Sequence, residues 1–250
     1  MLYETVKYLR KGKVAYITLN RPEALNAING QLEADLRAAL NRYDLDDKAW
    51  VAILSGSGRS FCSGADIKER FIGMSRDEKS RWSMAGGPDS FLDKCANWKP
   101  VIAAIHGYAL GWGISIALEC DLITASEEAL FGITETKRSF TAGRVWGKAH
   151  TFMPSKLTTE LLLTGEPMSA SVLHNMGLIN RFVPIGQHLK AAEELAKKLI
   201  DCPPLAVRAG VRITRWAWTR WIEDTDLYYQ PIKLHLTKDF VESSNSFVEK

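Results

Sequence analysis

The chain has 250 residues, a length that suits one sizeable domain or a core with a small appendage. Hydrophobic residues make up 46% of the sequence and charged residues 24%, which excludes a disordered, collagen-like or coiled-coil protein. The formal net charge of +3 gives no strong electrostatic reason to expect nucleic acid as a partner.

A strand, a helix and a second strand are predicted near the start of the chain. Residues 13–19 are rich in β-forming side chains and predict a strand that ends at the turn 20–22. Apolar residues recur at helical spacing over residues 32–40, behind a possible helix cap at Asn29. Residues 50–54 are a continuous apolar run, short enough to be a buried strand.

The same alternation continues through the middle of the chain. Residues 55–64 are rich in glycine and serine and predict a loop, and residues 76–98 predict a mainly helical segment. A buried strand is expected at 101–105, a helix at 113–119 and a further strand at 122–124. Strands that alternate with helices are typical of an α/β fold.

The pattern becomes purely helical beyond Pro184. Apolar residues repeat at helical spacing over residues 189–199, and a pair of prolines ends that helix. Further helical segments follow, with three tryptophans close together within residues 216–221. The sequence therefore predicts an α/β core over residues 1–185 and a C-terminal helical region over residues 186–250.

Cysteine usage and the N-terminus bear on where the protein is found. Four cysteines are spread along the chain without a C-x-x-C pair: Cys62, Cys95, Cys120 and Cys202. Such spacing favours reduced thiols in the cytoplasm over disulfides or a zinc site. The N-terminus is charged from Glu4 onward, and the apolar stretch 101–118 contains His106 and three glycines. We therefore expect a cytoplasmic protein with no membrane partner.

Several common catalytic and cofactor motifs are absent or incomplete. No H-E-x-x-H zinc motif occurs, and residues 111–113 lack the third glycine of a dinucleotide fingerprint. Residues 143–148 have the wrong spacing for a phosphate-binding loop, and residues 113–117 lack the last glycine of a hydrolase nucleophile elbow. We therefore expect no metal and no redox cofactor.

Two small-residue loops remain, and each follows a predicted buried strand. One covers residues 60–68 and the other covers residues 106–113, where it opens a helix. Small residues let backbone N–H groups approach a ligand, and a helix N-terminus adds further donors. Two such donors that converge on one carbonyl oxygen would form an oxyanion hole.

These loops resemble those of the enoyl-CoA hydratase/isomerase, or crotonase, superfamily. The resemblance lies in FCSGADIKE at 61–69, in KPVIAAIHGYALGWGISIALECDLITAS at 99–126 and in ALFGITE at 129–135. It extends to LNRPEALNAI at 19–28 and to the C-terminal residues 247–250. The resemblance implies a crotonase-like ββα spiral core, a C-terminal helical trimerisation region and an acyl-CoA thioester as substrate.

The resemblance also implies which groups act on the thioester. The backbone N–H groups of Ala65 and Trp112 would stabilise the enolate, although Trp112 stands where the family usually has glycine. Its indole either borders the acyl path and restricts the pocket, or packs into the core. Of the two glutamates found in well-studied hydratases, Glu135 matches one, whereas Ser115 replaces the other. Glu135 would be the acid/base with a pKa raised by burial, and Ser115 could hold a water or a substrate oxygen.

A single carboxylate leaves the reaction open. Hydration or double-bond isomerisation of an enoyl-CoA is the leading hypothesis, because isomerases of the family can work with one glutamate. The pairing of Ser115 with Glu135 also resembles hydroxycinnamoyl-CoA hydratase-lyases. Lys137, Arg138 or Arg144 could grip a substrate carboxylate, which would suit a decarboxylase, or could form a solvated basic face. A non-catalytic acyl-CoA-binding or scaffold homologue is the further alternative.

Residues 65–68 (Ala65, Asp66, Ile67 and Lys68) match family positions that line the coenzyme A. Phe247 and Lys250 match positions that reach coenzyme A from the terminal helix. Coenzyme A is part of the substrate, so no separate cofactor is implied. The resemblance further implies a homotrimer or a homohexamer.

Overall fold

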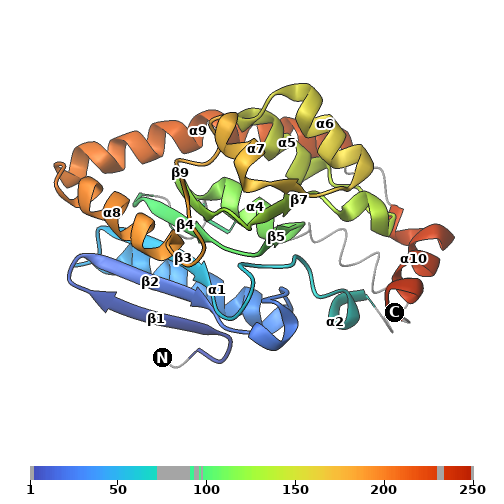
Figure 1. Ribbon diagram of the computed structural model, residues 1–250, viewed down its shortest axis with the longest axis horizontal. Coiled ribbons are helices and arrows are strands. Elements are labelled where there is room, and N and C mark those ends of the chain that lie inside the picture. The colour runs from blue at the N-terminus through green and yellow to red at the C-terminus, as the bar shows by residue number, and fades with distance from the viewer. Residues whose placement is uncertain (1–2, 72–90, 93–95, 97, 230–233, 249–250) are drawn as a thin grey trace.

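The computed structural model describes residues 3–71, 91–92, 96, 98–229 and 234–248, and its centre is a six-stranded sheet (Figure 1). The strands lie in the order β1-β2-β3-β4-β6-β9. Their bounds are β1 (Val6–Lys11), β2 (Val14–Leu19), β3 (Val51–Gly56), β4 (Val101–Ile105), β6 (Leu122–Ser126) and β9 (Arg181–Val183). Strands β1 and β2 pair antiparallel, and every other pair in this sheet is parallel.

The central strands β3 and β4 are buried on both faces of the sheet, which explains why they are continuous apolar runs. In β3, Ala52 and Leu54 belong to the main core, which also contains apolar side chains of α1 (Gly30–Leu45). The alternate residues Val51 and Ile53 pack instead against α8 (His188–Ile200). The period of two along the strand thus divides its side chains between the two layers.

Helix α1 begins where the sequence predicts. The Asn29 side chain accepts a hydrogen bond from the Leu32 amide at 2.9 Å, which satisfies one of the donors at the helix N-terminus. Glu69 supports the same end, because its carboxylate accepts a hydrogen bond from the Asn29 side chain at 2.6 Å. Glu69 lies in the short helix α2 (Ile67–Phe71), so α1 is joined directly to the loop that follows β3.

A smaller sheet and several helices lie beyond the carboxyl ends of the central strands. The smaller sheet contains β5 (Tyr108–Leu110), β7 (Leu130–Gly132) and β8 (Met168–Ser169). The remaining α-helices are α4 (Trp112–Glu119), α5 (Gly143–Phe152), α6 (Ser155–Thr164), α7 (Ala170–Asn175), α9 (Pro204–Tyr229) and α10 (Lys238–Val248). The 3-10 helices among the described residues are η1 (Pro22–Ala24), η2 (Glu135–Arg138) and η3 (Leu234–Leu236).

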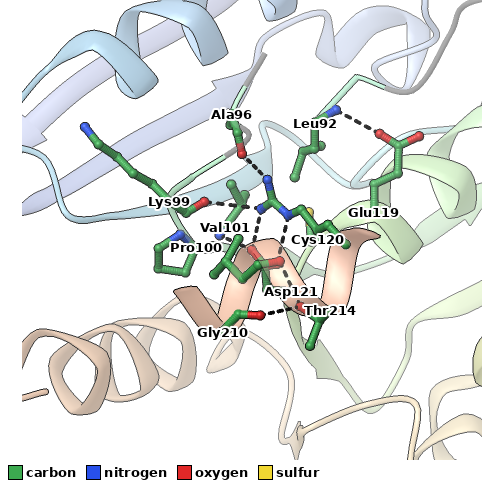
Figure 2. Close-up of polar contacts among 12 residues, drawn as sticks. Leu92, Ala96, Lys99, Pro100, Val101, Glu119, Cys120, Asp121, Gly210 and Thr214 are labelled. Carbon is green, nitrogen blue, oxygen red and sulfur yellow. Dashed lines mark hydrogen bonds and ion pairs between the residues drawn. The ribbon is translucent and has the colours of Figure 1, made fainter. Parts of the chain in front are cut away.

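A buried arginine in α9 binds residues that precede strands β4 and β6. The Arg215 guanidinium donates to both carboxylate oxygens of Asp121, at 3.0 and 2.5 Å, and to the carbonyl oxygens of Ala96 and Lys99. Figure 2 shows Asp121, Ala96 and Lys99 gathered at this contact. Arg215 is 2% exposed, so the ion pair holds α9 from inside the protein.

Most predicted elements are found, with small shifts in their ends. The loop predicted at 55–64 is shorter, because its first two residues complete β3. Most of the helical prediction at 76–98 lies outside the described residues. The division at residue 185 stays a prediction, although α8, which follows it, covers the sheet. No helix within the described ranges is long and apolar enough to cross a membrane.

Candidate active site

The two small-residue loops lie against each other. The Cys62 amide donates to the Tyr108 carbonyl at 2.9 Å, and the Leu110 amide donates to the Cys62 carbonyl at 3.0 Å. Gly64 has a φ of +103°, and a Cβ atom there would stand 2.9 Å from the Leu110 oxygen and 3.6 Å from the Trp112 nitrogen. Only glycine allows both this backbone conformation and this close approach.

Hydrogen bonds of the neighbouring residues indicate where the Ala65 amide points. The Gly64 carbonyl accepts from the Ile28 amide at 2.7 Å, and the Asp66 amide donates to the Ile28 carbonyl at 3.0 Å. Every described peptide bond is trans, so the N–H of Ala65 points opposite to the Gly64 carbonyl and away from Ile28. Gly64, the residue before Ala65, is also the residue that approaches the Trp112 amide.

The Trp112 amide is the first of α4, and at this position an N–H points out of the helix end. The two amides named from the sequence therefore belong to loops in direct contact. The Trp112 side chain is partly buried and packs against the main core. This contact agrees with the second of the two readings of the indole, and its effect on the acyl pocket stays a prediction.

Glu135 reaches the same place from η2, which follows β7. A Cβ atom on Gly111 would stand 3.1 Å from the Glu135 Oε1 atom, so the carboxylate lies against the turn that opens α4. Its Oε2 atom is buried and has no hydrogen-bond partner among the described residues. Burial raises the pKa of Glu135 to about 7, against the opposing effect of the Glu135 and Thr134 amides. Near neutral pH the group can therefore both accept and donate a proton.

Ser115 lies one turn beyond Gly111 in α4, with its amide donating to the Gly111 carbonyl at 3.1 Å. Its hydroxyl accepts a hydrogen bond at 2.9 Å from the Lys148 ammonium of α5. Lys148 also forms an ion pair with Glu119, and each of these two residues is 2% exposed. Sequence reasoning missed both. The helical spacing of Ser115 and Glu119 was a usable signal, whereas nothing local marks Lys148 as their partner.

The residues predicted to line coenzyme A form α2 and the turn before it. Asp66 is ion-paired with Arg21 at 3.1 Å, and Lys68 is exposed. Helix α10 contacts both α2 and η2, and it lies beside α2 in Figure 1. Phe247 belongs to the last turn of α10, where only the backbone is described, and Lys250 lies outside the described residues.

The three basic residues after Glu135 differ in their surroundings. Lys137 is ion-paired with Glu166, and its side chain is 42% exposed. Its alkyl chain lies against Gly165, so it belongs to the solvated face and not to a carboxylate grip. Arg138 is half-buried, and burial lowers the pKa of its guanidinium; Arg144 is also half-buried. Across the described ranges, no three His, Cys, Asp or Glu side chains are grouped as metal ligands would be.

Comparison with known proteins decides the family. The enoyl-CoA hydratase/isomerase family model matches residues 10–250. The chain belongs to the enoyl-CoA hydratase/isomerase family. Among its relatives, (E)-benzylidenesuccinyl-CoA hydratase of Thauera aromatica is 39% identical over 198 residues, which are 78% of this chain and 76% of that protein.

Other members of the enoyl-CoA hydratase/isomerase family match the full length of the chain. A probable enoyl-CoA hydratase of Rhizobium meliloti (strain 1021) is 34% identical over 255 residues, covering 100% of this chain and 97% of that protein. The crystal structure of an enoyl-CoA hydratase/isomerase from Mycobacterium paratuberculosis gives a TM-score of 0.86 at 25% identity, covering 97% and 98% of the two chains. The predicted crotonase fold and the predicted acyl-CoA enzyme class are confirmed.

Proposed function

We propose that the protein adds water reversibly to the double bond of an enoyl-CoA thioester. The thioester oxygen would accept hydrogen bonds from the amides of Ala65 and Trp112. Glu135, as the carboxylate, would take a proton from water while the water oxygen bonds to Cβ and the electrons move to the thioester oxygen. The protonated Glu135 would then return this proton to Cα, so that water is added and the carboxylate is regenerated.

The observation that carries this proposal is the position of Glu135. Its carboxylate is buried against Gly111, in the turn that opens α4, and one of its oxygens has no partner in the described part of the chain. A pKa of about 7 suits a group that must act as base and then as acid in one cycle. The reaction is also consistent with relatives that are named hydratases.

Double-bond isomerisation is the second candidate. Ser115 provides a hydroxyl where a second carboxylate would stand, and Glu135 alone could move a proton from one carbon to another. The test is a panel of enoyl-CoA thioesters that includes benzylidenesuccinyl-CoA, with products identified by mass. Gain of one water supports hydration, whereas an unchanged mass with a shifted double bond favours isomerisation. Loss of carbon dioxide or a shortened acyl group would reveal a decarboxylase or a hydratase-lyase.

A non-catalytic binding protein is distinguished by exchange at the α-carbon. Incubation of a saturated acyl-CoA in D₂O should give deuterium at Cα if Glu135 works on a stabilised enolate. No exchange, together with measurable acyl-CoA binding, would refute the enzymatic proposal. Coenzyme A contacts through residues 65–68 and α10 belong to the same proposal, and the absence of any separate cofactor stays a prediction.

We further propose a homotrimer or homohexamer in the cytoplasm. Leu205, Ile213 and Trp216 of α9 support an assembly, because they are 76%, 68% and 64% exposed in the single chain. Sedimentation of the full chain tests the number of subunits. A monomer at micromolar concentration would contradict this proposal.

A further inference from the structure

Both carboxylate oxygens of Glu119, the ion-pair partner of Lys148, have hydrogen-bond partners within the protein. One Glu119 oxygen binds Lys148, and the other accepts from the amides of Phe91 and Leu92 at 2.6 and 2.9 Å. Figure 2 shows the Glu119 carboxylate directed at Leu92. Replacing a buried ion pair with apolar residues of similar volume is often neutral or stabilising. Stability alone therefore does not account for a charged lysine at this place.

The lysine determines the direction of the Ser115 hydrogen bond. An ammonium group has donors only, so the Ser115 oxygen must accept from Lys148 at 2.9 Å. The single hydroxyl proton of Ser115 then has to point to another acceptor. Within the described residues the Ser115 hydroxyl donates to no such acceptor, and the side chain is 8% exposed. Ser115 is therefore a buried donor whose acceptor has to come from outside the described chain.

The position of Ser115 on α4 indicates what that acceptor is. Ser115 and Glu119 are four residues apart in α4, so they share one helix face, and the N-cap residue Gly111 lies one turn before Ser115, whose amide donates to its carbonyl at 3.1 Å. Gly111 also lies against the Glu135 carboxylate. The Ser115 hydroxyl thus lies one helical turn from the group that would handle the proton, on the same side of α4.

We propose that Lys148 is a positioning residue that makes Ser115 a dedicated hydrogen-bond donor to an oxygen on the β-carbon of the acyl group. The ligand class is a 3-hydroxyacyl-CoA thioester. This role rests on the proposed acyl-CoA function, but it does not require turnover. It predicts preference for a β-oxygen in binding alone, whatever the reaction at Cα.

The test compares the Kd values of 3-hydroxybutyryl-CoA and butyryl-CoA by calorimetry on the full-length protein. One neutral hydrogen bond should make the hydroxylated ligand bind about three- to tenfold more tightly. Ser115→Ala should remove this preference. Lys148→Met alone would leave the Glu119 charge buried without its partner, so the informative variant is Lys148→Met/Glu119→Gln, which is neutral at both positions.

A mutant cycle separates positioning from a merely structural effect. We expect the Lys148→Met/Glu119→Gln pair to reduce the preference as Ser115→Ala does, and the triple variant to reduce it no further. The control is Arg10→Met/Asp46→Asn, which removes the 3.0 Å ion pair between strand β1 and the C-terminal end of α1 and should keep the wild-type ratio of the two Kd values.

Three results would overturn the proposal. The first is a ratio near one between the Kd values of butyryl-CoA and 3-hydroxybutyryl-CoA in the wild type. The second is an unchanged Kd ratio in the Lys148→Met/Glu119→Gln variant. The third is that this pair of substitutions changes the Kd ratio equally in the presence of Ser115 and in the Ser115→Ala background. If the protein turns over enoyl-CoA but binds the two ligands equally tightly, this inference is refuted and the hydratase proposal stands. If the protein binds the hydroxylated ligand more tightly but does not turn over enoyl-CoA, the hydratase proposal is refuted and this inference stands.

Discussion

Replacing Glu135 with glutamine should make the stability of the protein less dependent on pH while it removes turnover. The structure raises the pKa of Glu135 from an ordinary value of 4.5 to about 7, because the carboxylate is buried. The folded chain therefore binds this proton more tightly than the unfolded chain does. Between these two values the free energy of unfolding of the wild type falls as the pH rises.

The size of the effect follows from the shift. Each pKa unit corresponds to about 1.4 kcal/mol, so the wild type should lose about 3 kcal/mol between roughly pH 4 and pH 8 through this one group. Glutamine does not titrate and escapes the loss. Its buried amide carries a desolvation penalty of about 1–3 kcal/mol, but this penalty is the same at every pH. The measured quantity is therefore the change in the stability difference between two pH values.

Urea unfolding of both proteins near pH 5 and near pH 8, at one protein concentration, gives this quantity. Glu166→Gln is the control, because Glu166 is 71% exposed and an exposed ion pair contributes about 0–1 kcal/mol. A stability difference that is equal at the two pH values would refute the claim that burial of the Glu135 carboxylate raises its pKa. In parallel, kcat should fall at least about 100-fold, with acyl-CoA affinity nearly unchanged.

Three further substitutions test other parts of the structure. Trp112→Gly should change the ratio of kcat/KM between long and short acyl chains about tenfold or more, and an unchanged profile would place the indole away from the acyl path. Gly113→Ala should lower the free energy of unfolding by about 1–3 kcal/mol in urea, because its Cβ would stand 2.3 Å from the Cys62 carbonyl oxygen. Gly210→Ala in α9, with nothing within 4 Å, is its control and should be neutral or slightly stabilising. Arg215→Met should lower that free energy by about 3–5 kcal/mol, because it leaves Asp121 without its buried partner; a loss below about 1 kcal/mol would contradict the anchoring of α9.

Local pattern was enough for much of the fold. The β-rich run at 13–19, the helix capped by Asn29 and the buried strands at 50–54 and 101–105 are all found, because period and capping act within a few residues. The strand β1 was not predicted. Its burial alternates only weakly, and it is defined chiefly by antiparallel pairing with β2.

The family likeness pointed to Glu135, Ser115 and the two loop amides from the sequence alone. Their roles stay predictions, but the contact between the two loops and the burial of Glu135 agree with them. Lys137 shows the limit of such reasoning. Its charge could be read from the sequence. Its ion pair with Glu166, which follows α6, could not, because the two residues are far apart along the chain.

What the sequence by itself determined is the family and much of the alternation of strands and helices, because these depend on local pattern and motif spacing, and it named the candidate reactive groups. Only the tertiary structure decided that Lys148 meets Ser115 and Glu119, since this requires α5 to pack against α4. It also decided the pKa of Glu135, because the pKa depends on how far the surrounding chain excludes water from the carboxylate. Hydrogen-bond direction and proton affinity are properties of the packed neighbourhood, and no stretch of sequence contains that neighbourhood.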